Sequence, residues 1–341
     1  ARVGGTIESI NEQGYLRESG PNSVLDSTPL IGRLLEDLGI TGERVDASPE
    51  GRHRYIVRHG RPQAVPGSMA SFMATPLFSA RAKWRLFAEP FIARNAAKDE
   101  ESVASFMRRR LGAEIAEYAV DPFIAGIYAG DAEQLAMRAA FPRLHAWEAR
   151  HGSLTAGALL DPARKARNSG SKPGSSFSFV AGMQTLPDAI AARIRRIELA
   201  SPAMRLLPCR TGYSVVTGGS KGEREFRSRA VLLAIPALAA AQLVSSFTRQ
   251  TSAALADIPY APVTVACHGY ARDAIAHPLQ GFGYLVPRRE NRQILGTLFS
   301  STLFPGRAPW NNVMLTSFIG GMRQPALAAK DDDAIHAMLR E

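Results

Sequence analysis

Hydrophobic residues recur along the chain with the period of a strand in some segments and of a helix in others. Residues 5–10 and 14–18 predict two short strands around a polar turn. Apolar residues at helical spacing then predict a helix that follows Ser27, starts at Pro29 and ends at Gly39. The first part of the chain is therefore expected to mix strands with a helix.

A hairpin and a long helical stretch are predicted next. Residues 53–57 and 61–65 flank the turn at 59–60 and predict the hairpin. From 79 to about 150 the apolar spacing is mostly helical, with a loop predicted at 126–130. This stretch is expected to form a helical insert.

The second half of the chain returns to short strands. Strands are predicted at 177–180, 202–207, 213–216, 229–234, 263–270, 283–286, 293–299 and 313–319, and helices at 186–196 and 237–244. The polar, Gly- and Ser-rich residues 161–176 predict an exposed connection. We therefore predict a mixed α/β fold, with α/β pieces on both sides of a helical insert and an antiparallel run after them.

Length and composition are those of a folded protein. The chain has 341 residues, of which 45% are hydrophobic and 21% charged, and its length suggests about two domains. No stretch approaches the roughly 20 apolar residues of a membrane-spanning helix. The two Cys and seven His show no metal-ligand spacing, so we predict neither a metal site nor a disulfide framework.

Positive charge is concentrated in one segment. The net charge is +10, and residues 51–98 hold nine Lys or Arg but one acid, Glu89. Large apolar residues alternate with these cations, a combination that suits an anionic membrane surface or an apolar ligand with carboxylates. A helical face with solvated cations is the alternative. No nucleic-acid-binding motif accompanies the segment, so we expect no nucleic acid partner.

Two glycine-containing motifs near the start suggest a dinucleotide site. Glycines such as Gly4 and Gly5, after Arg2, let backbone N–H groups approach a pyrophosphate. The loop Gly20-Pro21-Asn22-Ser23 offers a flat backbone, a stiff turn and hydrogen-bond donors beside a flavin ring. The G-x-G-x-x-G turn of such a site is not seen. We therefore expect an internal piece of a longer flavoprotein, which by itself would bind FAD weakly or not at all.

Further motifs follow these two in a characteristic order. They include Arg54-Tyr55-Ile56, Asp121-Pro122-Phe123-Ile124-Ala125-Gly126, Gly182-Met183-Gln184-Thr185-Leu186, Leu295-Gly296-Thr297-Leu298-Phe299 and Phe304-Pro305-Gly306-Arg307-Ala308-Pro309. In this order, from Arg2 to about Arg323, they resemble the oxygen-dependent, FAD-containing protoporphyrinogen oxidases of the flavin amine oxidase-like superfamily.

The resemblance implies three interleaved domains. An incomplete Rossmann-like FAD domain would take residues 1–50 and 192–256. A helical, membrane-associated domain would take residues 51–164. An antiparallel-sheet substrate domain would take residues 165–191 and 257–341. The basic, aromatic-rich segment falls in the predicted membrane-associated domain, which strengthens the expectation of a membrane surface as partner.

The resemblance also implies a reaction. Protoporphyrinogen IX would be oxidised to protoporphyrin IX in three two-electron steps, and O2 would accept the electrons and give H2O2. The flavin would carry the redox chemistry, so no catalytic side chain is predicted. The enzyme would act in heme biosynthesis, and the isolated piece is expected to be inactive.

Particular residues are implied by their match to the family's motifs. Arg54 would anchor a propionate through paired hydrogen bonds, and Phe299 would pack on the tetrapyrrole face. Phe282 would form an apolar wall, and Gly126 would leave room for the macrocycle. Arg2, Gly4, Gly5 and the Gly20–Ser23 loop would bind FAD. Ala203 would lie near the adenine end of FAD.

Several alternatives remain open at the level of sequence. Coproporphyrinogen III oxidation to coproporphyrin III would use the same fold, and a flavin amine oxidase would share the Arg-x-Gly-Gly motif. A non-catalytic fragment or membrane-surface module is the alternative from another class. The resemblance allows a homodimer. It implies a cytoplasmic protein on the inner face of the cell membrane if the source is bacterial, or an organelle membrane if it is eukaryotic.

Overall fold

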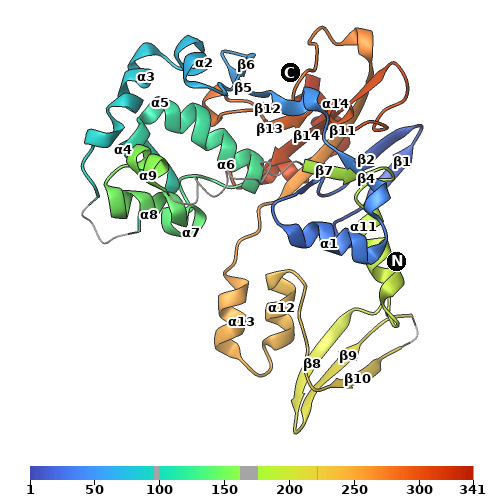
Figure 1. Cartoon of the computed structure of the whole chain (residues 1–341). Coiled ribbons are helices and arrows are strands. Elements are labelled where there is room, and N and C mark those ends of the chain that lie inside the picture. The colour runs from blue at the N-terminus through green and yellow to red at the C-terminus, as the bar shows by residue number, and fades with distance from the viewer. Residues whose placement is uncertain (96–99, 162–175, 221, 341) are drawn as a thin grey trace. The chain divides into compact units, whose positions relative to one another are not determined.

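The computed structural model describes residues 1–95, 100–161, 176–220 and 222–340, and these form two compact units (Figure 1). The smaller unit comprises Ala1–Gly5 and Pro187–Tyr260. The larger unit comprises Thr6–Leu186 and Ala261–Glu341. Most of the predicted connection at 161–176 lies outside the described residues.

The larger unit contains three sheets, the largest of which has six strands in the order β11-β14-β13-β12-β5-β6. Its strands are β5 (Arg54–Arg58), β6 (Arg61–Ala64), β11 (Val263–Ala271), β12 (Gly283–Leu285), β13 (Ile294–Leu298) and β14 (Asn312–Gly320). Neighbours are antiparallel except β12 and β5, which run parallel. The predicted hairpin and the late antiparallel run are thus confirmed, and one parallel pairing joins them.

Two small sheets complete the strands of this unit. The hairpin β1 (Ser9–Glu12) and β2 (Tyr15–Glu18) confirms two strands around a turn, but the first strand begins at Ser9 rather than at residue 5 as predicted. The other sheet has the order β3-β7-β4, with β3 (Val24–Leu25), β4 (Arg44–Asp46) and β7 (Ser176–Phe179). Strand β7, from the middle of the chain, therefore pairs with two strands from the start of the chain.

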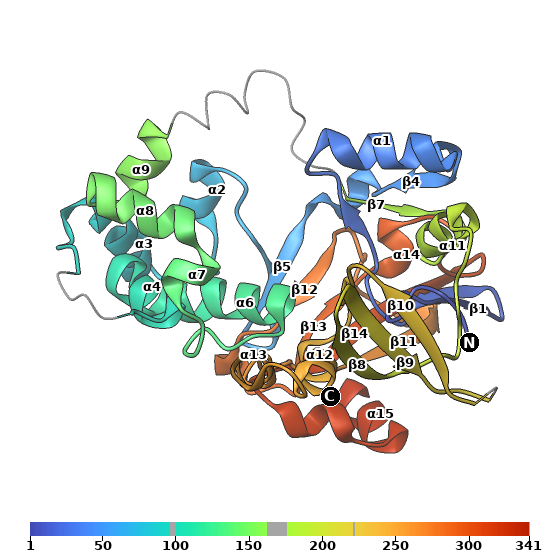
Figure 2. The same cartoon turned by 90° about the horizontal axis from the view of Figure 1, so that it is seen from below.

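Most helices of the larger unit lie between β6 and β7 in the sequence and gather on one side of the six-stranded sheet (Figures 1 and 2). They are α2 (Met69–Ala74), α3 (Ala80–Phe87), α4 (Val103–Leu111), α5 (Ala113–Ile115), the π-helix η4 (Ala116–Val120), α6 (Asp121–Tyr128), α7 (Met137–Ala140), α8 (Pro142–His151) and α9 (Leu154–Leu160). Apart from this group lie α1 (Pro29–Leu38), α11 (Thr185–Arg193), α14 (Ser300–Leu303) and α15 (Asp332–Arg340). Of these, α11 extends into the smaller unit.

Local signals explain where these helices start and stop, and they correct one prediction. The hydroxyl of Thr28 caps α1, which starts at Pro29 as predicted, by accepting the N–H of Leu30. The predicted loop at 126–130 was wrong, because α6 continues to Tyr128 and ends where Ala129 is left-handed, with φ of 48°. A glycine inside a helix is tolerated when packing needs it, which local spacing does not reveal.

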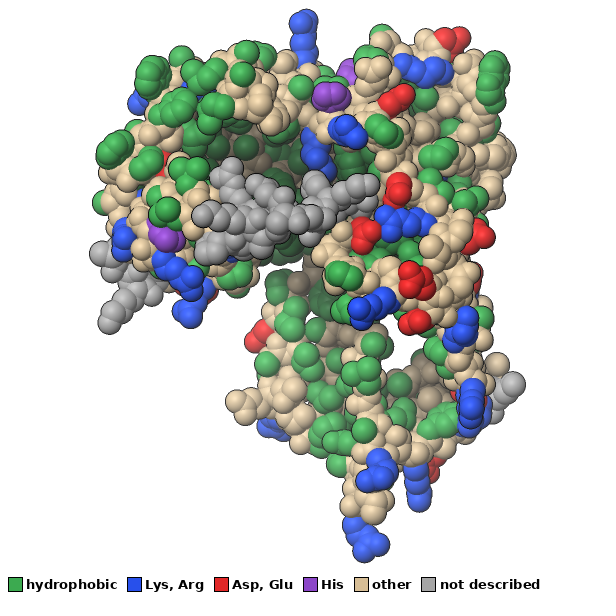
Figure 3. Space-filling model, in the orientation of Figure 1, with side chains coloured by type: hydrophobic (Ala, Val, Ile, Leu, Met, Phe, Trp, Pro, Cys, Tyr) green, Lys and Arg blue, Asp and Glu red, His purple; other side chains and the backbone are tan. Residues whose placement is uncertain are grey.

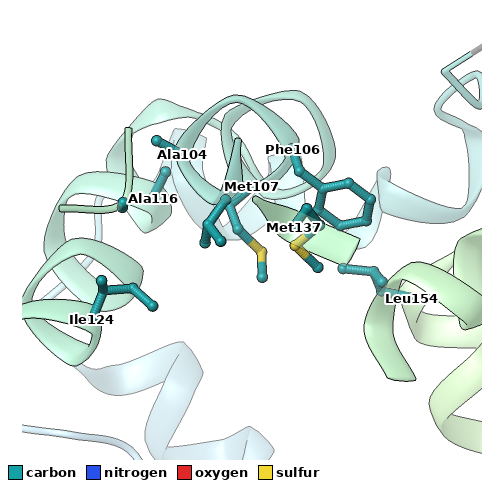
Figure 4. Close-up of a cluster of buried hydrophobic side chains, with 9 residues drawn as sticks. Ala104, Phe106, Met107, Ala116, Ile124, Met137 and Leu154 are labelled. Atoms are coloured by element: carbon teal, nitrogen blue, oxygen red, sulfur yellow. The ribbon is translucent and has the colours of Figure 1, made fainter. Parts of the chain in front are cut away.

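Two apolar clusters hold the helices together and attach them to the sheet. Figure 4 shows the first, in which Phe106, Met107 and Met137 from α4 and α7 point toward one another. In the second, Ile56 of β5 packs with Leu77, among other apolar residues. Burying each such side chain stabilises the fold by about 1.5–3 kcal/mol. The helical layer is therefore bound to the sheet through β5.

The smaller unit pairs a three-stranded antiparallel sheet with two helices. The order is β10-β9-β8, with β8 (Ala203–Cys209), β9 (Gly212–Thr217) and β10 (Arg224–Ser228), beside α12 (Ala237–Val244) and α13 (Arg249–Ala256). The strand predicted at 229–234 was wrong: the third strand is 224–228, which pairs with β9. Within the described ranges no strand pairs with 229–234, and Leu232 is 91% exposed.

Candidate functional site

Three of the predicted substrate-binding residues lie on or beside adjacent strands at the centre of the six-stranded sheet. Arg54 pairs with Gly283, and Gly283 pairs with Leu298 on the next strand. The N–H of Phe299 donates to the carbonyl oxygen of Phe282 at 3.1 Å. The structure thus brings the backbones of these three residues together from distant parts of the sequence. The ring of Phe299 packs with Tyr55 and Tyr284, which lie on the other face of the sheet from Arg54.

Arg54 is an exposed cation that rests on an aromatic ring. Its guanidinium carbon lies 5.1 Å from the centroid of the Phe282 ring. Among the described residues, no carboxylate forms an ion pair with Arg54. A guanidinium that is held by an aromatic ring and has no acidic partner can pair with a carboxylate of a ligand through two parallel hydrogen bonds.

The ring of Phe299 is buried within the protein. Its centroid lies 5.6 Å from that of His277, 6.2 Å from Tyr284 and 6.4 Å from Tyr55. The hydroxyl of Tyr55 donates to the carbonyl oxygen of Gln280 at 2.7 Å, which holds the loop before Phe282. The Phe299 ring therefore packs with other aromatic side chains at this end of the sheet. Its contact with a macrocycle stays a prediction.

Gly126 of α6 allows the helix to approach the sheet closely. A Cβ at this position would overlap Cδ2 of Leu285 on β12. Because side chains alternate along a strand, Leu285 and Gly283 share one face of the sheet, and the pairing of Gly283 with Arg54 puts Arg54 on that face too. The helix face that carries Gly126 therefore lies over the face of the sheet that carries Arg54.

The loop Gly20–Ser23 connects β2 with β3 and packs against the start of the larger unit. A Cβ on Gly20 would overlap the carbonyl oxygen of Thr6, and the side-chain amide of Asn22 donates to the carbonyl oxygen of Gly20 at 3.3 Å. The N–H of Ser19 donates to the carbonyl oxygen of Glu8 at 2.8 Å. The loop therefore has a defined shape in the protein alone.

A buried ion pair directly before this loop was not anticipated from the sequence. Glu18 accepts a hydrogen bond from Nη1 of Arg307 at 2.9 Å, and both side chains are almost fully buried. Burial lowers the pKa of Arg307, and the charge and hydrogen bond of Glu18 counteract this. Arg307 lies in one of the motifs quoted above and Glu18 lies close to another. This position was the signal in the sequence that could have indicated their importance.

The remaining predicted FAD residues belong to the smaller unit. Gly4 and Gly5 have φ of 104° and 58°, and no atom lies within 4 Å of where a Cβ on Gly5 would be. Arg2 donates hydrogen bonds to the carbonyl oxygens of Val3 and Gly5. Ala203 is exposed at the start of β8. Successive left-handed glycines can present backbone N–H groups to an anion, so a role of Gly4 and Gly5 in binding FAD phosphates stays a prediction.

The comparison with known sequences agrees with this chemistry. The family described as flavin containing amine oxidoreductase matches residues 1–341. Protoporphyrinogen oxidase 2 of Arabidopsis thaliana is 31% identical, over 98% of this chain and 71% of that relative. Coproporphyrinogen III oxidase of Bacillus subtilis is 25% identical, over 100% of this chain and 74% of that relative.

A solved structure supports the fold independently. A crystal structure from Exiguobacterium, provisionally named a protoporphyrinogen oxidase, superposes with a TM-score of 0.81 at 21% identity, over 99% of this chain and 74% of that one. It confirms the predicted mixed α/β fold of FAD amine oxidase-type enzymes. The chain therefore belongs to the flavin-containing amine oxidoreductases, a family of FAD enzymes, and has the protoporphyrinogen oxidases among its relatives.

Proposed function

We propose that this protein oxidises protoporphyrinogen IX to protoporphyrin IX with O2 as acceptor. The observation that carries the proposal is Arg54, an exposed guanidinium that stacks on Phe282 and has no acidic partner among the described residues. A porphyrinogen is a large apolar macrocycle with propionates, so it needs both an apolar surface and such a cation. The similarity to protoporphyrinogen oxidases supports the same substrate.

The reaction balances in three equal rounds. Each round removes two electrons and two protons from the macrocycle and reduces one O2 to H2O2, so three O2 are consumed for each porphyrin formed. FAD, when bound, would supply the electron acceptor for these rounds. Arg54 would hold a propionate and Phe282 would form an apolar wall against the macrocycle.

Coproporphyrinogen III is the second candidate substrate. It carries four propionates instead of two, and a relative that is 25% identical is named for its oxidation. The number of cationic side chains that reach the bound substrate should decide between two propionates and four. Arg54 is one such side chain.

The two substrates are separated by one assay. The product of the complete gene, reconstituted with FAD, is supplied with either porphyrinogen in air, and porphyrin fluorescence and H2O2 are followed. We expect protoporphyrinogen IX to be the better substrate by kcat/KM. A higher kcat/KM for coproporphyrinogen III would transfer the proposal to the second candidate. Turnover of neither substrate by the FAD-loaded protein would refute both.

We further propose that the protein associates with the surface of a membrane. Between α2 and residue 91, Met69, Met73, Trp84, Phe87 and Phe91 are exposed, and Trp84 and Phe91 are 72% and 90% exposed. Figure 3 shows hydrophobic side chains gathered over α2 and α3. Cations of the same segment accompany them. None of the helices in the described ranges is long and apolar enough to cross a membrane.

Vesicle sedimentation tests this association. Trp84→Ser with Phe91→Ser should weaken binding to vesicles that contain anionic lipid by about tenfold or more, because each aromatic ring contributes buried apolar area. Trp310→Ser is the matched control, since Trp310 is 92% exposed elsewhere in the larger unit. Equal loss in both variants, or no binding by the unaltered protein, would contradict the proposal. A peripheral location on the inner face of a bacterial membrane, or on an organelle membrane, and a homodimer stay predictions.

A further inference from the structure

The buried pair Glu18–Arg307 connects segments that are far apart in the sequence. Besides Arg307, Glu18 accepts hydrogen bonds from the hydroxyl of Ser9 at 2.5 Å and from the N–H of Met183 at 3.0 Å. The hydroxyl of Ser9 in turn accepts the N–H of Gln184 at 3.0 Å. One carboxylate thus joins β1, β2, the turn before α11 and the segment after α14.

Arg307 links the residue before the Gly20–Ser23 loop to a strand that pairs with the segment after the loop. Its Nη1 donates to Glu18, which lies two residues before Gly20, at 2.9 Å. Its Nη2 donates to the hydroxyl of Ser178 on β7 at 2.5 Å. β7 pairs with β3, which follows Ser23 directly. The loop is therefore held at its start by Glu18 and at its end by β7, and one guanidinium bridges the two.

We propose that Glu18 and Arg307 are positioning residues for the cofactor: they fix the backbone of the Gly20–Ser23 loop, which would lie beside the flavin. This inference rests on the proposed function, because it takes the loop to lie beside the ring. A fixed loop presents its N–H groups and the side chains of Asn22 and Ser23 without an ordering cost when FAD binds. A loop that is free to move would bear that cost.

The physical character of the pair favours positioning over stability. Desolvating two charges costs about as much as their attraction returns, so a buried ion pair is weak evidence for stabilisation. Directional hydrogen bonds from several segments, in contrast, specify one arrangement of those segments. Both carboxylate oxygens of Glu18 have donors, and the Nη atoms of Arg307 donate to Glu18 on β2 and to Ser178 on β7.

The chain contains a matched control. Glu89 and Arg110 form a second, fully buried ion pair, which lies among the helices and involves none of the predicted FAD residues. Glu89 also accepts hydrogen bonds from Ser153 Oγ and the N–H of Leu154. Glu18→Gln and Glu89→Gln therefore remove the same charge from comparable surroundings at two different places.

The test measures FAD affinity and the visible spectrum of bound FAD in the product of the complete gene, together with the melting temperature. We expect Glu18→Gln and Arg307→Met each to weaken FAD binding by about tenfold or more, the effect of losing roughly one hydrogen bond to a charged group. The spectrum of the remaining bound FAD should shift. Arg307→Lys should recover part of the affinity, and Glu89→Gln should leave affinity and spectrum unchanged.

Two results would overturn the inference. One is FAD affinity and spectrum unchanged in Glu18→Gln and Arg307→Met; the other is an equal loss of affinity in Glu89→Gln. If these variants fail to fold, Ser178→Ala provides a milder test, because it removes a single hydrogen bond to Arg307. It should weaken FAD binding severalfold. Unchanged FAD affinity in Ser178→Ala would also contradict the inference. FAD binding is measured without porphyrinogen, so the two proposals fail separately. A protein that binds FAD but oxidises no porphyrinogen would refute the proposed substrate. The comparison of FAD affinity between the Glu18 and Glu89 variants would still test the positioning role.

Discussion

Arg54 is the residue on which substrate binding is expected to depend most. Arg54→Ala should raise the KM for protoporphyrinogen IX by about 10- to 100-fold and change kcat little, because a paired hydrogen bond to a charged group contributes about 1.5–3 kcal/mol. Arg54→Lys should recover only part of this, since an ammonium lacks the planar fork. Steady-state kinetics with each variant checks the split between KM and kcat.

Arg52 provides the control for this substitution. It is exposed and lies two residues before Arg54, at the end of a 3-10 turn. Arg52→Ala changes the net charge equally and should leave KM nearly unchanged. A similar rise in KM for both variants would mean that general electrostatic attraction, rather than a specific contact of Arg54, accounts for binding.

Glu89 is expected to make stability depend on pH. Burial alone would raise its pKa, but hydrogen bonds from Ser153 and from the N–H groups of Leu154 and Thr155 outweigh this and lower the pKa to about 2. The ordinary pKa of an unfolded Glu is about 4.3. A pKa depressed by folding gives a stabilising contribution that is complete above about pH 4.3 and is lost as the pH falls toward 2.

Glu89→Gln should accordingly lower stability near pH 7, by at most about 3–5 kcal/mol, because the buried Arg110 then keeps, among the described residues, only the carboxylate of Glu148, at 3.5 Å. Its free energy of unfolding should fall less steeply between pH 5 and 2, roughly the range set by the two pKa values, than that of the unaltered protein. Denaturant unfolding at several pH values measures both effects. The same pH slope in both proteins would show that Glu89 titrates normally.

Among single residues, the sequence identified those that carry recognisable chemistry and overlooked those that act through partners. Arg54 and Phe282 were both predicted, and the structure stacks one on the other. Glu18 and Arg307 were passed over, because a buried ion pair between residues far apart in the chain has no local pattern. Their importance depends on burial and on hydrogen bonds that form only in the folded protein.

At the level of elements, the contact between α6 and β12 decides how closely the helical layer approaches the sheet. Alanine is a better helix former than glycine by about 1 kcal/mol, so helix propensity alone would make Gly126→Ala stabilising. The overlap of the new Cβ with Leu285 should reverse that sign and destabilise the protein by about 1–3 kcal/mol. Denaturant unfolding of the single variants gives the sign.

A double-mutant comparison isolates this contact. In the background of Leu285→Ala the space over Gly126 is open, so Gly126→Ala should become neutral or stabilising. The same destabilisation in both backgrounds would show that α6 does not depend on its approach to Leu285.

Elements with local signals were predicted well, and those that need a partner were not. The hairpin β5–β6 and α1 follow from alternation and from the residues at their ends. The apolar run at 229–234 was mistaken for a strand because periodicity does not report a hydrogen-bonding partner. The parallel pairing of β12 with β5 could not be predicted either, because a local pattern does not show which distant strand a strand pairs with.

In the whole molecule, segments far apart in the sequence build each part. The six-stranded sheet takes β5 and β6 from one region and four strands from another, and the smaller unit takes Ala1–Gly5 together with Pro187–Tyr260. Fold class and family could be predicted because many motifs appear in one order along the chain. The predicted division into three domains stays a prediction, since two compact units do not test it.

The central claim is that FAD in this protein takes electrons from a porphyrinogen and passes them to O2. The most direct measurement mixes the FAD-loaded product of the complete gene with protoporphyrinogen IX without oxygen and follows the visible absorbance. We predict that the absorbance of oxidised flavin disappears as porphyrin forms, and that it returns, with release of H2O2, when air is admitted. Flavin that stays oxidised in the presence of protoporphyrinogen IX would contradict the account.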